Sequence, residues 1–282
     1  MGIALSKQHC EFFYPCIKCM KTFNTELYAE QNENGELSLS CVNEPLSAFT
    51  TIYFNPKLVV KTEETHPPFC IKIPTGAVLA IVDVGKRMGN VCVNLADDNL
   101  IATIVNNEYT ERIAEFVYEE TTRVYADYME PSSYKNVWRV DPVFWSELIE
   151  NTEKIPSEIT LSFEETIEAK WSEVALKTVS KHGVQSSIVS DTSLFEAYEV
   201  GKSCSLITSG AEFAAIVEAC LSISAPISGY FTENIPHLLL TANCGKDIHW
   251  DFVLSTVNRD TLHDEEDIPS PVFDETGGET TE

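Results

Sequence analysis

Apolar and polar residues follow the same order in two segments of the chain, residues 69–117 and residues 204–253. Each segment begins with a short apolar run that leads into a turn containing Gly76 or Gly210, and an alanine-rich helical stretch follows. A polar break and further alternating apolar residues then close each segment on a Phe-Val pair. Spacing matched over about fifty residues predicts a duplicated unit of about half the chain.

The period of the apolar positions predicts the elements of the first half. We expect short strands at residues 3–6 and 9–13 and a helix at residues 14–23, where Pro15 suits the first helical turn. An Asn-Gly pair between two alternating runs predicts a β-hairpin. The other predicted elements of this half are a helix at residues 75–87 and strands at residues 26–30, 36–40, 48–54, 69–73, 90–96, 99–106 and 111–118.

The second half repeats the order of the first. Asp141 and Pro142 predict the N-cap and first residue of a helix at residues 141–154, and a second helix is expected at residues 209–223. The predicted strands are residues 136–140, 158–164, 174–180, 184–190, 194–199, 203–207, 226–231, 237–243 and 248–256. Few helices against much antiparallel strand indicate an α+β fold, with the helices of each half on one face of the sheets.

Length and composition add domain boundaries to this pattern. With 282 residues, 44% of them apolar, the chain can hold two ordinary domains. We expect domains at residues 1–120 and 136–257, a tyrosine-rich connector at residues 121–135, and a tail at residues 258–282. The tail is acidic and poor in large apolar residues, which predicts disorder. No apolar run reaches the roughly eighteen residues of a membrane span, so no membrane partner is expected.

The formal net charge of −25 argues against a protein that binds nucleic acid through bulk charge. The nine cysteines lie mostly in apolar runs, which indicates buried free thiols in a reducing compartment. His9, Cys10, Cys16 and Cys19 form a local cluster, but no second pair stands at zinc-finger distance. Two cysteines on one helix face explain this cluster better than a zinc site does, so no metal or cofactor is expected.

Candidate catalytic groups do not form a recognisable set. None of the six histidines accompanies a Gly-x-Ser-x-Gly turn, and no glycine-rich phosphate loop occurs. The paired acids Asp97-Asp98 and Glu119-Glu120 could bind a metal ion, although paired acids in turns are commonly solvated. We therefore expect no catalytic residue and no enzyme, with a β-rich hydrolase kept as the weaker alternative.

Several short motifs together resemble the PCNA-like DNA sliding clamps, and most closely the Rad-nine-type subunit of the checkpoint (nine-one-one) clamp. The likeness covers residues 1–257 and has no short invariant signature. The motifs that carry it are Thr25-Glu26-Leu27-Tyr28-Ala29-Glu30, Gly35-Glu36-Leu37-Ser38-Leu39, Val42-Asn43, Ser47-Ala48-Phe49, Phe54 and Phe252-Val253-Leu254-Ser255-Thr256.

The resemblance implies two tandem clamp domains whose helices line the inside of a ring around duplex DNA. In the checkpoint clamp two other clamp subunits complete a heterotrimer, so this chain would be one of three different subunits. The resemblance also implies the function of that clamp, which is signalling of DNA damage in the nucleus. A clamp loader, repair enzymes and a checkpoint kinase activator are the further partners implied, and no catalysis is implied. A homotrimeric replication clamp is the alternative, which the weak basic charge of the helices and the acidic tail disfavour.

The resemblance also assigns surfaces. Inner helices of clamps present basic residues to phosphates, and here Lys18, Lys21, Lys86 and Arg87 are the candidates. Without the resemblance, these four residues would indicate no more than an ordinary solvent-exposed helix face. The two helices of the second half supply almost no basic residue, so DNA contact should be lopsided towards residues 1–120.

Clamp rings close by strand addition between neighbouring subunits. The candidate edges are residues 111–118 and 184–190, and the interface residues proposed on them are Ile113, Phe116, Val184, Ser186 and Ile188.

Two further segments have competing interpretations. In the connector, Tyr125, Tyr128 and Met129 are large and expected to be exposed, so they are candidates for partner docking, or else they pack back on the chain's own surface. In the tail, Ser270 and Thr276 are candidate phosphorylation sites, or else the acidic segment only keeps the protein soluble.

Overall fold

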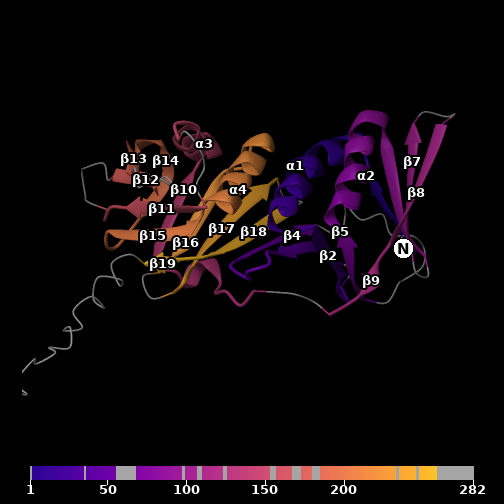
Figure 1. Ribbon diagram of the computed structural model, residues 1–282, viewed down its shortest axis with the longest axis horizontal. Helices are drawn as coiled ribbons and strands as arrows, with labels where there is room; N and C mark the ends of the chain where they lie inside the picture. Colours follow the sequence, from indigo (N-terminus) through magenta and orange to yellow (C-terminus); the bar gives the residue numbers. More distant parts are fainter. Residues whose placement is uncertain are drawn as a thin grey trace, which may run out of the picture.

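Four helices lie side by side along one face of a long antiparallel sheet (Figure 1). The structure is a computed structural model. It describes residues 2–34, 36–54, 68–96, 99–106, 110–122, 126–152, 157–166, 173–179, 185–232, 235–245 and 248–258. Residues 259–282 of the predicted tail, with Ser270 and Thr276, lie outside these residues, as do Tyr125 and Val184.

The helices are α1 (Lys7–Phe23), α2 (Thr75–Met88), α3 (Pro142–Glu150) and α4 (Gly210–Ser222). They are arranged in the order α3, α4, α1, α2, because α1 packs against both α2 and α4 while α3 packs against α4. In the described part of the chain, none of the helices is long and apolar enough to cross a bilayer.

The strands of the first half agree with the alternating pattern. The hairpin predicted around the Asn-Gly pair is confirmed, because Tyr28 pairs with Ser40 in antiparallel register. The strands are β1 (Gly2–Leu5), β2 (Glu26–Gln31), β3 (Leu37–Val42), β4 (Ala48–Phe54), β5 (Phe69–Pro74), β6 (Asn90–Ala96), β7 (Asn99–Asn106), β8 (Thr110–Val117) and the short β9 (Glu119–Glu120).

The second half has the same order of elements. Asp141 caps α3 as predicted, because its carboxylate accepts a hydrogen bond from the backbone N–H of Val143 at 2.9 Å. The strands are β10 (Asn136–Val140), β11 (Glu158–Phe163), β12 (Glu173–Val179), β13 (Gln185–Asp191), β14 (Phe195–Glu199), β15 (Cys204–Ser209), β16 (Ile227–Phe231), β17 (His237–Cys244), β18 (Ile248–Ser255) and β19 (Val257–Asn258). Two 3₁₀ turns lie at Pro131–Ser133 and Thr192–Leu194.

The strand predicted at residues 9–13 is wrong, because this segment is the first part of α1. Ser6 begins the helix: its side chain accepts a hydrogen bond from the N–H of His9, and the His9 ring accepts one from the N–H of Ser6. Buried Cys10 and Phe13 continue the apolar spacing of the helix rather than alternating. Pro15 therefore lies inside the helix, where its missing N–H removes one intrahelical hydrogen bond.

The order of elements occurs four times in the chain, and the two duplicated segments of the sequence are two of these four units. One strand, one helix and three strands follow one another beginning at β1, β5, β10 and β15. In the first half the order β1-β6-β7-β8 forms one sheet, and in the second half β10-β16-β17-β18 are neighbours in the same sequence. Likewise β4-β3-β2-β5 in the first half corresponds to β13-β12-β11-β15 in the second.

The two halves are joined into one sheet of ten strands, in the order β14-β10-β16-β17-β18-β4-β3-β2-β5-β9. The junction is the antiparallel pair β18–β4, which runs from Ile248↔Phe54 to Leu254↔Ala48. Beneath the helices a single buried core spans both halves, and its most buried large side chains include Trp138, Trp145 and Met20. Burial of this apolar surface is the main contribution that holds the helices on the sheet.

Candidate nucleic-acid and partner interfaces

The four helices form one continuous surface, here called the helix face, on the side of the ten-stranded sheet where Figure 1 shows them. In α1 the buried side chains point to the core, so the polar positions Lys18 and Lys21 lie on the solvent side. In α2 the basic residues Lys86 and Arg87 lie in the last turn, where cations interact favourably with the helix dipole. The helix face therefore carries all four residues predicted to face DNA.

The structure brings two of these residues together. Lys18 and Lys86 line a common groove between α1, α2 and α4, together with Tyr14 and Glu218. The ammonium of Lys86 lies 3.6 Å from the ring centroid of Tyr14, a cation–π contact. Lys21 is exposed one turn further along α1, and Arg87 is exposed at the end of α2.

Most of these cations are paired with acids on the same face. Lys18 Nζ lies 2.5 Å from Glu218 Oε1 on α4. Asp83 contacts both Arg87 at 2.5 Å and Lys86 at 3.6 Å. The pKa of Lys18 is raised by its hydrogen bond to Glu218, so the side chain stays cationic.

The second half of the helix face is acidic, as predicted. Helices α3 and α4 carry no basic residue, and their charged side chains are Glu147, Glu150, Glu212 and Glu218. Two of these acids link the halves: Glu218 contacts Lys18, and Glu212 accepts a hydrogen bond from the Asn43 amide at 2.9 Å. The sequence pattern did not indicate these two contacts, because the partners lie 200 and 169 residues apart.

The two predicted edges are terminal strands. β8 ends the sheet β1-β6-β7-β8, and β13 ends the sheet β13-β12-β11-β15-β19. Ile113 on β8 is 63% exposed, whereas Phe116 on β8 and Ile188 on β13 are half-buried and pack against the core. Val117 and Val189, which the sequence argument left out, are exposed apolar residues on the same two strands. Ser186 also belongs to β13.

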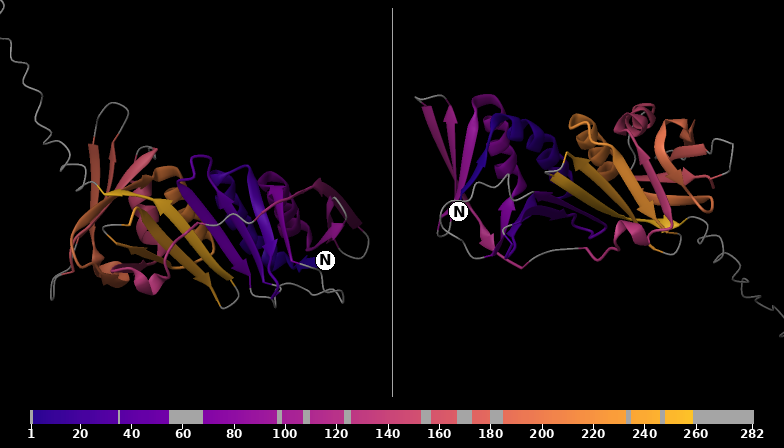
Figure 2. Two further views of the ribbon diagram at one scale, coloured as in Figure 1. Left: turned by 90° about the horizontal axis from the view of Figure 1, so that it is seen from below. Right: turned by 180° about the vertical axis from the view of Figure 1, so that it is seen from behind.

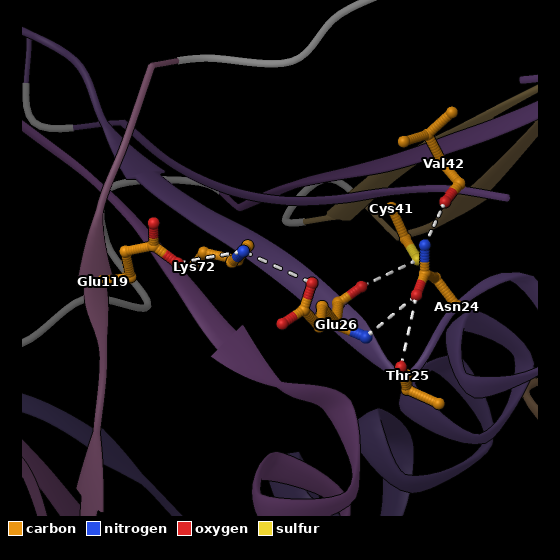
Figure 3. A network of polar contacts seen from close by, with 7 residues as sticks. All are labelled: Asn24, Thr25, Glu26, Cys41, Val42, Lys72 and Glu119. Carbon is orange, nitrogen blue, oxygen red and sulfur yellow. Dashed lines mark hydrogen bonds and ion pairs between the residues drawn. The ribbon is translucent and has the colours of Figure 1, made fainter. Parts of the chain in front are cut away.

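Residues 126–135 of the connector run along the outer face of the ten-stranded sheet, the face opposite the helices (Figure 2). The beginning of the connector is fixed by β9, which pairs with β5. Figure 3 shows the ammonium of Lys72 between two carboxylates, 2.9 Å from Glu119 on β9 and 3.4 Å from Glu26 on β2.

In the same view Asn24, at the end of α1, donates a hydrogen bond to the carbonyl of Val42 at 2.8 Å.

The expected exposure of Tyr128 and Met129 is wrong, because both side chains are half-buried against the outer face. They pack on a small apolar cluster of Phe49, Leu239 and Val253. The connector thus follows the second interpretation of its aromatic residues, that they pack back on the chain's own surface. A partner at this site would contact a connector that is already docked.

A buried carboxylate holds the middle of the connector. Asp251 is 6% exposed, and Oδ2 accepts a hydrogen bond from the Tyr128 hydroxyl at 2.9 Å. His249 Nε2 lies 2.6 Å from Oδ1 of Asp251, and its Nδ1 lies 2.8 Å from Oδ1 of Asn243. The hydrogen bond to Asp251 raises the pKa of His249, while partial burial opposes the shift.

A second histidine holds the end of the connector. The Tyr134 hydroxyl lies 2.7 Å from Nε2 of His237. Burial lowers the pKa of His237 and favours its neutral form. Strict alternation could have placed His249 and Asp251 on one face of β18, but their connector partners required the structure.

The cysteines around α1 are buried thiols. Burial raises the pKa of Cys10 to about 11 and that of Cys16 well above its ordinary value. His9 is occupied in the cap of α1. Within the described ranges no group of three or more His, Cys, Asp or Glu side chains is placed to hold a metal ion.

Comparisons with known proteins agree with the fold. The model of the Rad9 family matches residues 13–257. The chain is similar to the crystal structure of a PCNA2–PCNA3 complex from Sulfolobus tokodaii, with 15% identity and a TM-score of 0.72, and to PCNA from Thermococcus kodakaraensis, with 10% identity and a TM-score of 0.71. Each likeness covers 91% of this chain and 99% of the other. No curated relative matches the chain. Identities this low show the fold alone, and the predicted α+β, PCNA-like fold is thereby confirmed.

Proposed function

Because the chain belongs to the Rad9 family, we propose that it is one subunit of a heterotrimeric ring that encircles duplex DNA and signals DNA damage. The observation that carries this proposal is the pair of strands β8 and β13, each of which ends its sheet among the strands that the structure describes. By the fourfold pattern, β8 corresponds to β18 and β13 corresponds to β4. Since β18 and β4 already pair within the chain, the same kind of joint can form between β8 of one subunit and β13 of the next.

The helix face supports the placement of DNA inside the ring. It carries Lys18, Lys21, Lys86 and Arg87, and basic side chains are the groups that neutralise DNA phosphates. Residues 1–120 and 136–257 would be the two clamp domains, with residues 121–135 as the connector on the outside.

The acidic second half favours a heterotrimer over a homotrimer. Three copies of this chain would place three copies of α3 and α4, with their four glutamates, on the inside of the ring. Like charge facing phosphate is unfavourable, so partner subunits with more basic helices would supply most of the attraction to DNA. A homotrimeric replication clamp therefore remains the second candidate.

Assembly tests the proposal directly. The full chain should elute as a monomer alone and as a ring with its partner subunits when analysed by gel filtration with light scattering. Replacing the exposed residues Ile113 and Val117 on β8, or Val189 on β13, with lysine should block the ring, because charges on an edge strand discourage strand pairing.

The melting temperature should hardly change, since these side chains are exposed. Exposed Val143→Lys on α3 is the matched control and should assemble normally. Ring formation by both edge variants would refute the edge assignment, and a stable trimer of the chain alone would favour the homotrimer.

The signalling part of the proposal concerns the acidic tail. Phosphate at Ser270 or Thr276 would be recognised by an arginine- or lysine-lined pocket of a kinase activator, because the tail itself offers almost no basic partner. We expect the protein to act in the nucleus. In a reconstituted assay, a chain that ends at Asn258 should still form the ring and be loaded on DNA by the clamp loader, yet fail to activate the checkpoint kinase. Normal kinase activation by the shortened chain would contradict this role.

A further inference from the structure

The cations of the helix face are held by carboxylates of the same face. Glu218 holds Lys18, and Asp83 holds both Lys86 and Arg87. The side chains of Lys18 and Glu218 are 54% and 63% exposed, so water reaches the pair and it can open without disturbing the core. Lys21 differs, since no acidic group lies within 4 Å of its ammonium among the residues that the structure describes.

This arrangement sets up a competition. A DNA phosphate that approaches the groove between α1, α2 and α4 meets Lys18 and Lys86 already paired with carboxylates. An exposed ion pair is worth little, so displacing it reduces the affinity for phosphate by up to about fivefold for each pair. Such a face would hold DNA weakly and release it quickly.

We propose that Glu218 and Asp83 are built-in competitors of the DNA backbone, which keep the contact of this chain with duplex DNA weak enough for a ring to slide. The proposal rests on the proposed function, in which the helix face is turned towards DNA. It goes beyond that function because it assigns a role to two acidic residues. Glu218 and Asp83 act through the lysines and arginine that they hold and are positioning residues.

A purely structural role for Glu218 is the competing explanation. Together with Glu212, it ties α4 of the second half to the first half. In that case its removal would lower the stability of the junction and leave DNA affinity unchanged. Removal of the Glu218 charge should therefore change DNA affinity under the first explanation and the melting temperature under the second.

Binding of the full chain to a labelled random-sequence duplex, measured by fluorescence anisotropy over a range of salt concentrations, tests the proposal. Glu218→Gln and Asp83→Asn should each raise the affinity at low salt by up to about fivefold. The slope of log affinity against log salt should steepen by about one for each cation set free. Glu130→Gln, an exposed acid of the connector, is the matched control and should change neither quantity.

Two further variants make the result specific. Lys21→Ala should weaken binding most among the lysine variants, because Lys21 is already free to contact phosphate, and Lys135→Ala on the connector should not. In a Lys18→Ala background, Glu218→Gln should no longer steepen the slope, since no cation remains to be released.

If the lysine variant weakens binding but neither acid variant strengthens it, the competitor role is wrong and the DNA-facing helix face survives. If no variant on the helix face changes binding, both the inference and the proposed orientation are wrong. A lower melting temperature of Glu218→Gln with unchanged DNA affinity would assign Glu218 to the junction alone and overturn the proposal.

Discussion

The two halves of the molecule share one order of elements but use different side chains at the same places. In the first half, α1 and α2 carry five basic residues, Lys7, Lys18, Lys21, Lys86 and Arg87, and pack through small residues such as Cys10 and Gly85. In the second half, the charged residues of α3 and α4 are all acidic, and the two helices cover an aromatic core around Trp138 and Trp145. The backbone pattern of the fold is thus separable from both the charge and the packing of its helices.

In the second half, aromatic rings fill the space beneath the helices. Trp138 and Trp145 lie 5.5 Å apart, and Phe163 stacks on Trp138 with ring centroids 6.2 Å apart. Each of these large rings removes much apolar area from water and so contributes strongly to the stability of the core. In the first half the same space is closed by bringing α1 against α2, which requires Gly85 where the helices meet.

One glycine in each half lies directly against a neighbouring side chain, Gly85 on α2 and Gly229 on β16, and their replacement by alanine should give the largest effects. A Cβ at Gly229 would overlap the fully buried indole of Trp138, which cannot move aside. A Cβ at Gly85 would lie 2.6 Å from Cys10 Sγ and 2.5 Å from Val91 Cγ2. Gly229→Ala should destabilise the protein by about 1–3 kcal/mol, and Gly85→Ala by less, because alanine favours the helix by up to about 1 kcal/mol.

Urea unfolding followed by tryptophan fluorescence measures these changes. Gly76→Ala is the control, since nothing lies within 4 Å of the added Cβ, and it should be nearly neutral. Trp138→Phe should partly rescue Gly229→Ala, so the double variant should be more stable than the sum of the two single changes predicts. A larger loss of unfolding free energy for Gly85→Ala than for Gly229→Ala would contradict this prediction. It would show that the surroundings of Gly85 yield less to an added Cβ than the indole of Trp138 does.

The connector extends the comparison to the outer face. It is held on the first half by the Lys72–Glu119 ion pair. On the second half Tyr134 contacts His237 directly, whereas Tyr128 donates a hydrogen bond to Asp251, which His249 contacts from the other side. The two histidines have opposite pKa shifts. The raised pKa of His249 means that its contribution to stability is fully present below the ordinary value of 6.5 and is lost as pH rises through its folded pKa. The lowered pKa of His237 means that its contribution is present above 6.5 and is lost as pH falls through its folded pKa.

Two variants should therefore show opposite pH dependence of the unfolding free energy. His249→Asn should lose more stability at about pH 5 than at about pH 8, and His237→Asn should lose more at about pH 8 than at about pH 5. Hydrogen exchange of residues 126–135 should rise in parallel with each loss. Glu119→Gln, which weakens the anchor on the first half, should show little change over this pH range. Equal losses at both pH values would mean that the histidines do not hold the connector through their protonation states.

The sequence predicted the elements because their period is carried by local apolar spacing. The close match of α2, α4 and β5–β8 to the expected ranges follows from two copies of one pattern supporting each other. The beginning of α1 was missed because Cys10, Phe12 and Phe13 read as a short apolar strand, whereas the Ser6 cap that starts the helix is a single residue.

The sites were less predictable because their partners come from distant parts of the chain. Lys18 and Lys86 could be assigned to helices from the sequence, but Glu218 lies on another helix and only folding brings it to Lys18. Tyr128 was expected to be exposed because a linker has no periodicity from which burial can be read. Asp251 and Phe49, which cover it, belong to strands far away in sequence.

The central claim is that the first half of the helix face contacts DNA while the second half does not. A photoreactive amino acid at Lys21 on α1 or at Glu147 on α3, in the full chain assembled with its partner subunits on nicked circular duplex DNA, measures this contact directly. Both positions are exposed, and the same probe at Glu130 on the connector reports the background. We predict strong crosslinking to DNA from position 21 and crosslinking near background from position 147. Equal crosslinking from the two positions, or crosslinking from position 147 alone, would contradict the account.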